Sequence, residues 1–462
     1  MSEQYKNVVI GSGEAGKFLA WALARQGEPS IVVERAIVGG ACPTVACLPS
    51  KNVIYSAKVA SLVEHATRYG ISLTDSKLDM AGVRRRKKEM IDGLMELHAK
   101  LFHDSGAELL MGHAQFTEPK TVQVALNAGG TRTLRGERIF IAVGTRAFVP
   151  NLPGMAEAQP MTHVEALDLD RLPAHLVILG GGYVGLEFAQ ALRRFGSRVT
   201  ILQRGAQLLE REDAEFAEMI SQILQDDGIE ILLNTELVSV AGRSGQGVRL
   251  TVRSGGAERT IEASDLLVAT GRTPNTDRLG VELGGVALDA RGYVRVNERL
   301  ETTAPDVWAM GECAGSPQFT HVSYDDCRVV LANLSGGART TRNRLIPYCL
   351  FTDPELAHVG LTEKEAREQG IPYRVCQLPM AAIMRTRTHG ESRGLAKALI
   401  GADDRILGFT ALGVEASELM TAVEVAILGR LPYTVFREGI FAHPTTGEGL
   451  TALFAGAPTP VR

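Results

Sequence analysis

The chain contains few cysteines, six in 462 residues, and no continuous apolar run of membrane-spanning length. Crossing a bilayer as a helix takes about 18 or more such residues, so we expect no membrane span. Six cysteines are too few to form a disulfide scaffold for a chain of this length. A cysteine pair in such a protein is more often redox-active or catalytic. The opening residues MSEQYKN lack the layout of a signal peptide. We therefore expect a cytoplasmic protein.

The chain also lacks an excess of either charge. Lys plus Arg number 49 and Asp plus Glu number 53, which gives a formal charge of −4. This balance argues against nucleic acid or an acidic membrane as the main partner. We interpret the one basic run, residues 84–88, as the solvated face of a helix. No Cys/His set has zinc spacing, so we predict no metal site.

The segment GGACPTVACLPSK, residues 39–51, carries two cysteines, Cys42 and Cys47. In a regular α-helix, residues five apart are separated by a rise of about 7.5 Å. Disulfide-bonded Cα atoms lie about 4.4–6.8 Å apart, so a regular helix could not bridge them. Pro43 and Pro49 distort a helix. We predict a bent helix start that joins the sulfurs as a reversible redox pair; the alternative is two buried thiols acting as small apolar side chains.

A dinucleotide-binding fingerprint occupies the first residues of the chain. The apolar run 8–10 leads into Gly11-Ser12-Gly13-Glu14-Ala15-Gly16, a helical pattern follows, and a second apolar run ends at Glu34. In this strand–turn–helix–strand context Gly11 permits the tight turn, Gly13 allows the backbone to approach a pyrophosphate, and Gly16 allows close helix packing. Glu34 stands where an acid accepts a ribose hydroxyl. The pattern predicts a dinucleotide site.

A second fingerprint follows the apolar run 176–179. Gly180, Gly182 and Gly185 precede a helical pattern, and residues 199–202 form the next predicted strand. Two such motifs indicate two different dinucleotides, for which a flavin and a nicotinamide are the natural pairing. The second strand ends at Gln203-Arg204, where an NAD site places an acid. Arg204 and Arg211 are therefore candidate contacts for a 2′-phosphate, which favours NADPH; the alternative is that either arginine is a surface cation.

A candidate acid–base pair lies near the end of the chain, where His443 precedes Glu448 by five residues in HPTTGE. A histidine that is oriented by a carboxylate is a common general base.

The motifs GSGEAG, GGACPTVACLPSK, GGGYVGLE, ATGRTPN, AMGE and HPTTGE occur together and in this order. With them the chain resembles the pyridine nucleotide–disulfide oxidoreductases, the flavoprotein family of glutathione reductase, lipoamide dehydrogenase and mercuric reductase. The resemblance implies an α/β fold with two Rossmann-like domains, for FAD and NAD(P)H, and a C-terminal α+β dimerisation domain. We expect 1–150 and 272–343 to form the FAD-binding part, 151–271 the NAD(P)H-binding domain and 344–462 the dimerisation domain.

The resemblance also implies roles for individual residues. Cys42 would be the interchange thiol that faces the substrate, and Cys47 the charge-transfer thiol beside the flavin. Lys51 and Glu187 would form an ion pair near the flavin N5. Tyr183 would be the ring that covers the nicotinamide pocket until NADPH displaces it.

Further roles concern the cofactors and the dimer. Glu312 stands where the family usually has an Asp that contacts the FAD ribityl chain, and the extra methylene keeps the acceptor. His443 and Glu448 would come from the other subunit of a homodimer and complete each active site. The motifs also imply cofactor contacts at Gly11, Gly13, Glu14, Ala15, Gly16, Glu34, Gly40, Lys51, Gly144, Gly180, Gly182, Gly185, Arg204, Arg211, Gly271, Arg272, Gly311 and Glu312.

Within the family, the segments FTHVSYDD (319–326) and LPMAAIMRTRT look like a branch near mercuric reductases and the reductases of reactive-chlorine resistance and copper reduction. The tail APTPVR has no vicinal cysteines, which a soft metal needs for its transfer, so we do not expect efficient mercury handling. We expect an NAD(P)H-dependent FAD enzyme that passes electrons through Cys42–Cys47 to a metal ion or small oxidant. The alternatives are a low-molecular-weight disulfide reductase, a lipoamide dehydrogenase-like enzyme, and a non-catalytic flavin-binding redox sensor.

Overall fold

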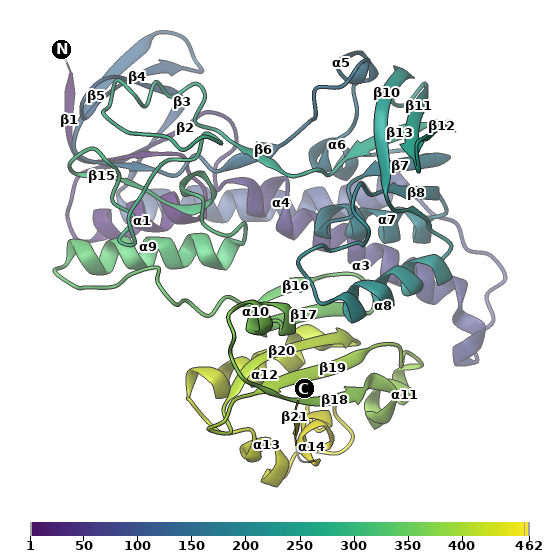
Figure 1. The fold of residues 1–462 in the computed structure, drawn as a ribbon. Helices are drawn as coiled ribbons and strands as arrows, with labels where there is room; N and C mark the ends of the chain where they lie inside the picture. Colours follow the sequence, from purple (N-terminus) through teal and green to yellow (C-terminus); the bar gives the residue numbers. More distant parts are fainter. Residues whose placement is uncertain (1, 457, 461–462) are drawn as a thin grey trace.

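The structure is a computed structural model that describes residues 2–456 and 458–460. The chain forms three lobes, two above and one below in the view of Figure 1. Each lobe is built on its own β-sheet, and helices cover the sheets of the two upper lobes. This mixed α/β architecture confirms the fold class predicted from the sequence.

The first lobe holds a sheet in the order β1-β2-β3-β4-β5-β15, in which β1 also pairs with β5. Its middle strands β1 and β2 are parallel and buried at their carboxyl ends, because helices cover one face of the sheet and the strands β3–β5 with residues 279–304 cover the other. The strands are β1 (Glu3–Ile10), β2 (Ser30–Glu34), β3 (Glu108–Glu118), β4 (Thr121–Leu126), β5 (Thr131–Ile141) and β15 (Val307–Ala309). The covering helices are α1 (Glu14–Arg25), α4 (Met80–Ser105) and α9 (Thr320–Leu334).

The last strand of this sheet, β15, pairs in parallel with β5 although more than 160 residues of chain separate them. The chain therefore leaves the first lobe, builds the second, and returns. The two crossings between the upper lobes run side by side as β6 (Thr145–Ala147) and β14 (Arg272–Pro274), an antiparallel pair.

The second lobe repeats the strand–helix–strand arrangement. Its parallel sheet has the order β13-β7-β8-β9, and α7 follows the second glycine-rich turn as α1 follows the first. The elements are β7 (His175–Leu179), α7 (Tyr183–Phe195), β8 (Arg198–Leu202), α8 (Ala214–Asp226), β9 (Glu230–Leu232) and β13 (Asp265–Val268). A separate antiparallel sheet consists of β10 (Thr235–Arg243), β11 (Gly247–Ser254) and β12 (Ala257–Ala263). Two short helices, α5 (Met155–Ala158) and α6 (His163–Leu167), precede β7.

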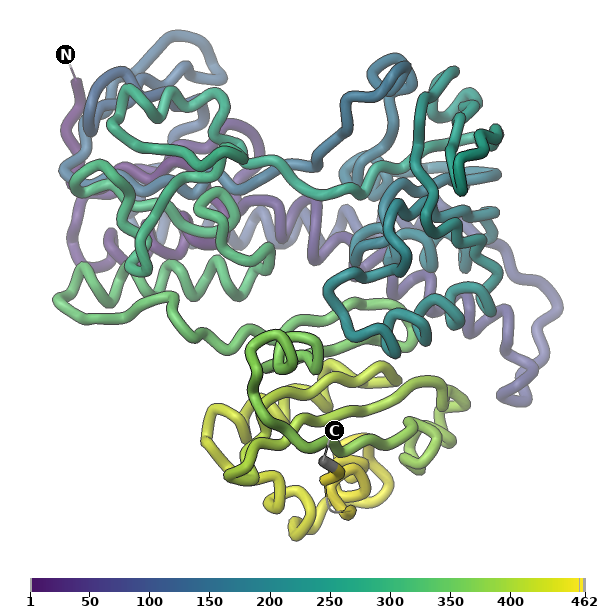
Figure 2. The backbone as a smooth tube through the Cα atoms, viewed as in Figure 1, coloured from purple at the N-terminus to yellow at the C-terminus, as the bar shows by residue number. Residues whose placement is uncertain are grey.

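Residues 335–347 cross from the first lobe to the third, as the green trace in Figure 2 shows. The third lobe is an antiparallel sheet in the order β16-β17-β20-β19-β18-β21. Its strands are β16 (Tyr348–Leu350), β17 (Glu355–Gly360), β18 (Arg374–Pro379), β19 (Leu395–Ile400), β20 (Ile406–Gly413) and β21 (Thr459–Pro460). Its helices are α10 (Glu363–Glu368), α11 (Met384–His389), α12 (Ala416–Leu428), α13 (Thr434–Glu438) and α14 (Gly449–Phe454).

A buried ion cluster joins the second lobe to the third. Lys397, only 2 % exposed, lies 2.8 Å from Asp213 and 2.9 Å from Glu363, and it also pairs with Glu215. Asp213 in turn accepts hydrogen bonds from the backbone amides that begin α10. A buried cation with several carboxylate partners is costly to separate, so these contacts fix the third lobe against the loop that precedes α8.

Residues 47–105 contain two α-helices, α3 (Cys47–Glu64) and α4, and residues 70–79 between them form no helix. One sequence expectation needs correction. The basic run 84–88 is a solvated face except for Lys87, which is 4 % exposed, donates to the carbonyl of Leu167 and pairs with Asp168. None of the helices described has the length and hydropathy to cross a membrane.

Candidate active site

A single cavity of about 1710 Å³ extends along the junction of the three lobes. Both glycine-rich turns, the segment with Cys42 and Cys47, and the start of α9 line it. Of the predicted site residues, the cavity is lined by Gly11, Gly13, Glu14, Ala15, Glu34, Gly40, Cys42, Cys47, Lys51, Gly144, Gly180, Gly182, Tyr183, Glu187, Arg204, Arg211, Gly271, Arg272, Gly311 and Glu312. One continuous space therefore connects both dinucleotide motifs with the two thiols.

The first glycine-rich turn leaves room for a ligand where the sequence predicts it. A Cβ on Gly11 would lie 2.4 Å from the carbonyl of Ala142, and one on Gly16 would lie 2.2 Å from the carbonyl of Gly11. These two glycines serve backbone packing, whereas the nearest atom to a Cβ on Gly13 is 3.6 Å away. Since no side chain caps α1, its first amides are available to a pyrophosphate. The turn fits a dinucleotide such as FAD.

Glu34 ends β2 beside this turn. Its carboxylate accepts hydrogen bonds from the Ser12 amide at 3.0 Å, the Ser12 hydroxyl at 2.7 Å and the Ala36 amide at 2.9 Å. A carboxylate has about four acceptor sites, so one remains for a ribose hydroxyl. The Ser12 hydroxyl also accepts from the Gly39 amide at 2.9 Å. The acid thus ties the first turn to the segment that carries the cysteines.

The cysteines lie on either side of a break between two helices. Cys42 is in α2 (Ala41–Thr44) and Cys47 is the first residue of α3, with Val45 and Ala46 in non-helical conformations between them. A Cβ on Gly40 would lie 2.5 Å from the Cα of Gly13, so the start of α2 packs directly on the first glycine-rich turn. This is the bent helix start that the two prolines predict. Both residues are free thiols in this structure.

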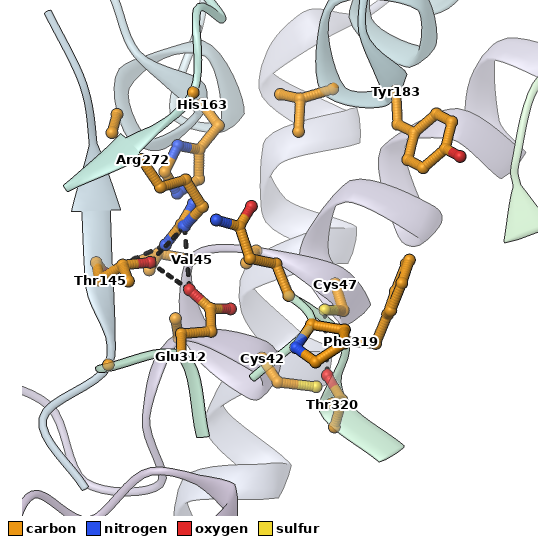
Figure 3. Close-up of a pocket in the computed structure, with 18 of the residues that line it drawn as sticks. Cys42, Val45, Cys47, Thr145, His163, Tyr183, Arg272, Glu312, Phe319 and Thr320 are labelled. Carbon is orange, nitrogen blue, oxygen red and sulfur yellow. Dashed lines mark hydrogen bonds and ion pairs between the residues drawn. The ribbon is translucent and has the colours of Figure 1, made fainter. Parts of the chain in front are cut away.

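The surroundings make the two thiols unequal. The neighbouring Cys42 thiol lowers the pKa of Cys47, and the Thr320 hydroxyl and the Lys51 charge lower it further, whereas burial raises it. The neighbouring Cys47 sulfur, together with burial, raises the pKa of Cys42. The Thr320 hydroxyl lies 3.3 Å from the Cys47 sulfur (Figure 3). Deprotonation of the reduced pair therefore occurs first at Cys47.

Lys51 and Glu187 connect the cysteine helix to the second lobe. The ammonium of Lys51 on α3 lies 2.8 Å from a carboxylate oxygen of Glu187 on α7. The other carboxylate oxygen accepts the Phe351 amide at 3.0 Å, and the Phe351 ring lies 4.7 Å from the ammonium. Glu187 is 7 % exposed, and an amide and a cation satisfy its charge. The predicted pair forms in the cavity wall.

The second glycine-rich turn repeats the geometry of the first. A Cβ on Gly180 would lie 2.5 Å from the carbonyl of Ala269, and one on Gly185 would lie 2.2 Å from the carbonyl of Gly180. A Cβ on Gly182 would meet no atom within 4 Å. The turn therefore offers the uncapped amides of α7 to a second dinucleotide. At the end of β8 the side chain of Gln203 folds back to accept the Gly181 amide at 3.0 Å.

Tyr183 begins α7 and lines the cavity, and sequence reasoning missed its partners. Its hydroxyl donates to the Glu212 carboxylate at 2.6 Å, and the Tyr348 hydroxyl donates to both Glu212 oxygens at 3.0 and 3.2 Å. Burial and the Glu212 charge raise the pKa of both tyrosines. The three residues are up to 165 positions apart, so no local pattern could have joined them.

Glu312 and Arg272 lie next to each other in the cavity wall and form an ion pair, as Figure 3 shows. Arg272 donates to the Glu312 carboxylate at 3.0 Å, and the Thr145 hydroxyl bonds to the same oxygen. The additional methylene of Glu312, relative to the usual Asp, extends its carboxylate to this pair. A Cβ on Gly144 or Gly271 would meet no atom within 4 Å, which leaves open space beside the pair.

His443 and Glu448 form a pair away from this cavity. The Nδ1 atom of His443 lies 2.9 Å from a carboxylate oxygen of Glu448, and the imidazole is 65 % exposed. Neither residue lines the cavity that holds the cysteines. Within one chain the structure therefore does not bring this pair to Cys42.

Two dinucleotide turns and a thiol pair in one cavity define a disulfide oxidoreductase with two nucleotide sites. The chain belongs to the pyridine nucleotide–disulphide oxidoreductases: the model of that family matches residues 5–326, and the model of its dimerisation domain matches residues 346–454. This family uses FAD and takes electrons from NAD(P)H, which confirms the predicted enzyme class and cofactors.

Individual relatives cover almost the whole chain. "Probable pyridine nucleotide-disulfide oxidoreductase RclA" of Escherichia coli is 37 % identical to this chain, and the match covers 98 % of this chain and 99 % of the relative. A mercuric reductase of Streptomyces lividans is 36 % identical, over 96 % and 94 % of the two chains. A solved structure, the Cu(II) complex of the HOCl-induced flavoprotein disulfide reductase RclA from Escherichia coli, matches with a TM-score of 0.89 and 35 % identity, covering 98 % of this chain and 99 % of that one. The predicted resemblance to both groups is confirmed.

The Thr320 contact predicts a measurable change in thiol ionisation. Replacing Thr320 with Val removes a hydrogen bond to the Cys47 sulfur, so we expect the pKa of Cys47 to rise by about one unit. The pH dependence of Cys47 alkylation by iodoacetamide in the reduced protein, followed by mass spectrometry, measures this shift. Thr451→Val, which removes a hydroxyl bonded to the Phe436 carbonyl in the third lobe, is the control. An unchanged Cys47 profile, or a Cys42 that ionises first, would contradict the assigned asymmetry.

Proposed function

We propose that the protein passes electrons from NAD(P)H through the Cys42–Cys47 pair to a thiophilic metal ion or a small oxidant. The observation that carries the proposal is the pair of unequal thiols in a cavity shared with both glycine-rich turns. A storage or sensing role would require neither the second dinucleotide turn nor a carboxylate-paired lysine beside the thiols. The Cu(II) complex of the RclA relative and the mercuric reductase relative support a metal ion as the acceptor.

The residues supply what the electron transfer requires. When bound, FAD relays a hydride from NAD(P)H as an electron pair to the disulfide. The pair of electrons breaks the sulfur–sulfur bond, and the proton equivalent of the hydride goes to the Cys42 sulfur. Cys47 is left as the thiolate, because its surroundings favour the charged form. The acceptor then contacts the Cys42 sulfur. Cys42 and Cys47 form the disulfide again and release two electrons, which pass as a pair to one oxidant or singly to two metal ions. The Cys42 proton passes to a base.

The nucleotide donor in this proposal is NADPH. Arg204 and Arg211 are exposed, line the cavity, and have no ion-pair partner among the described residues. Gln203, rather than an acid, follows the end of β8, and its side chain bonds to the glycine-rich turn through its oxygen and to the Glu210 carboxylate, at 2.9 Å, through its nitrogen. Two free arginines suit a 2′-phosphate.

We also propose that two copies of the chain share each active site, with His443 and Glu448 of one copy acting at the cysteines of the other. The match to a dimerisation domain supports this, as does the exposure of His443 away from its own cavity. Large apolar side chains are exposed at one face of α3 and around α12 and α13, which is typical of a surface that another chain covers. They are Leu48, Tyr55, Val59, Leu62, Val425, Leu428, Leu431, Val435, Ile440 and Phe441. Since the enzyme draws on NADPH, we place it in the cytoplasm.

The acceptor class can be tested by steady-state NADPH oxidation with Cu(II), Hg(II), quinones and small disulfides. We expect metal-ion turnover in the wild type and a loss of about 10³-fold or more in Cys42→Ser, because the transferring sulfur is gone. Quinone turnover should survive the substitution, since quinones can take electrons directly from the flavin. Turnover of a small disulfide alone would favour the disulfide reductase alternative, and metal reduction unaffected by Cys42→Ser would contradict the proposed route.

Donor preference can be tested with the variant Arg204→Ala/Arg211→Ala. We expect kcat/KM for NADPH to fall by about 10- to 100-fold, the effect of losing charged hydrogen bonds, while the value for NADH changes little. The control is Arg198→Ala, which removes an exposed arginine from the opposite end of β8. A wild type that uses NADH better, or a double variant with an unchanged preference, would show that these arginines are surface cations.

Active-site sharing can be tested by subunit complementation. His443→Ala and Cys42→Ser should each be nearly inactive as homodimers. Their mixed dimer contains one intact site, so randomly exchanged subunits should regain about a quarter of the wild-type activity with the metal acceptor. Differently tagged, co-expressed subunits allow the mixed dimer to be isolated. Failure of that purified dimer to regain activity would mean that each site belongs to a single chain.

A further inference from the structure

We propose that Glu212 is a positioning residue, a latch that holds the Tyr183 ring over the nicotinamide side of the cavity, and that Tyr348 keeps this carboxylate satisfied when Tyr183 moves away. The inference rests on the proposed function and assigns to it two residues outside the dinucleotide motifs.

The Glu212 carboxylate is an unusual group for its location. It is 2 % exposed, and among the described residues it has no cation partner and accepts hydrogen bonds from the two tyrosine hydroxyls alone. A buried charge without hydrogen-bond donors is costly, so these two phenols are what allow the carboxylate to stay there. The number of its donors therefore controls how freely either tyrosine can leave.

Tyr183 lies where it can block a ligand. It is the first residue of α7, next to the open space at Gly182, and Glu187 follows it by one helical turn on the same face. Tyr183 therefore lines the same cavity as the second dinucleotide turn and the Lys51–Glu187 pair, where a nicotinamide would approach. The side chain is half-buried, and its hydrogen bond to Glu212 is the short one, at 2.6 Å.

Tyr348, in contrast, is held from several sides. Its ring stacks on Phe319 with centroids 5.8 Å apart and planes at 3°, and it packs on His358 at 4.9 Å. Glu212 is fixed too, because the next residue, Asp213, is bonded to Lys397 and to the start of α10. Tyr348 and Glu212 are thus each fixed by further contacts. Tyr183 has one aromatic neighbour among the described residues, the Tyr348 ring at 5.9 Å, and it is the member that we propose to move.

This asymmetry gives the two hydroxyls opposite effects on nucleotide affinity. Without the Tyr183 hydroxyl, the ring is no longer latched, more molecules are open, and the nucleotide binds more tightly. Without the Tyr348 hydroxyl, Glu212 keeps only Tyr183 as a donor, and opening would leave a buried carboxylate with none. Opening then becomes less favourable, and the nucleotide binds more weakly.

The test measures NADP⁺ affinity by calorimetry, together with KM and kcat for NADPH, on the FAD-loaded enzyme. We expect Tyr183→Phe and Glu212→Gln to lower the Kd and KM, Tyr183→Phe by up to about tenfold, the effect of one hydrogen bond to a charged group. Tyr348→Phe should raise both by a similar factor. The double variant Tyr183→Phe/Tyr348→Phe should match Tyr183→Phe, because without the latch the second hydroxyl no longer affects opening.

Tyr5→Phe is the matched control, since it removes a tyrosine–glutamate hydrogen bond of the same kind, to Glu108 at 2.5 Å, at the far edge of the first lobe. Its affinity for NADP⁺ should equal that of the wild type. If Tyr183→Phe and Tyr348→Phe changed the Kd for NADP⁺ in the same direction, or if neither changed it, the proposed role of Glu212 would be overturned. Normal turnover of the wild type would then leave the proposed function intact. A wild type that neither binds NADP⁺ nor oxidises NADPH would overturn both.

Discussion

The placement of Cys42 beside Cys47 is the constraint on which the rest of this structure depends. It exists because the helix breaks at Val45 and Ala46, between α2 and α3, and so brings together two side chains that a continuous helix would separate. The same placement makes the thiols unequal, with the charge favoured on Cys47. A pair of sulfurs with one preferred thiolate can store two electrons and release them at the other sulfur.

The lobes are arranged to hold that pair between two nucleotide sites. Gly40 packs against Gly13, so the start of α2 is fixed to the first dinucleotide turn, and Lys51 joins α3 to α7 through Glu187. The third lobe contributes Tyr348, whose hydroxyl bonds to Glu212 beside that of Tyr183. Each lobe therefore supplies one wall of a single cavity, and the Lys397 cluster keeps the third wall in place.

Local patterns predicted the fold and the dinucleotide turns well, because the chemistry of those turns is contained in contiguous residues. Gly11 and Gly180 have positive φ and abut a neighbouring carbonyl, which only glycine tolerates, so their spacing identifies them without a structure. The proline-distorted thiol segment was predictable for the same reason. Contacts between distant segments were not: Thr320, Glu212 and Tyr348 carry no signature, and the burial of Lys87 depends on α6 and the residue after it. The catalytic roles of His443 and Glu448 stay a prediction, because a single chain does not bring these residues to the cavity that holds the cysteines.

The central claim is that electrons leave through the sulfurs of Cys42 and Cys47. Anaerobic titration of the FAD-loaded enzyme with dithionite, followed by flavin absorbance and by thiol counting, tests it most directly. The wild type should take up about two electron pairs per protomer, one for the flavin and one for the disulfide, and Cys47→Ser about one. A wild type that takes up about one electron pair and gains no thiols would contradict the account.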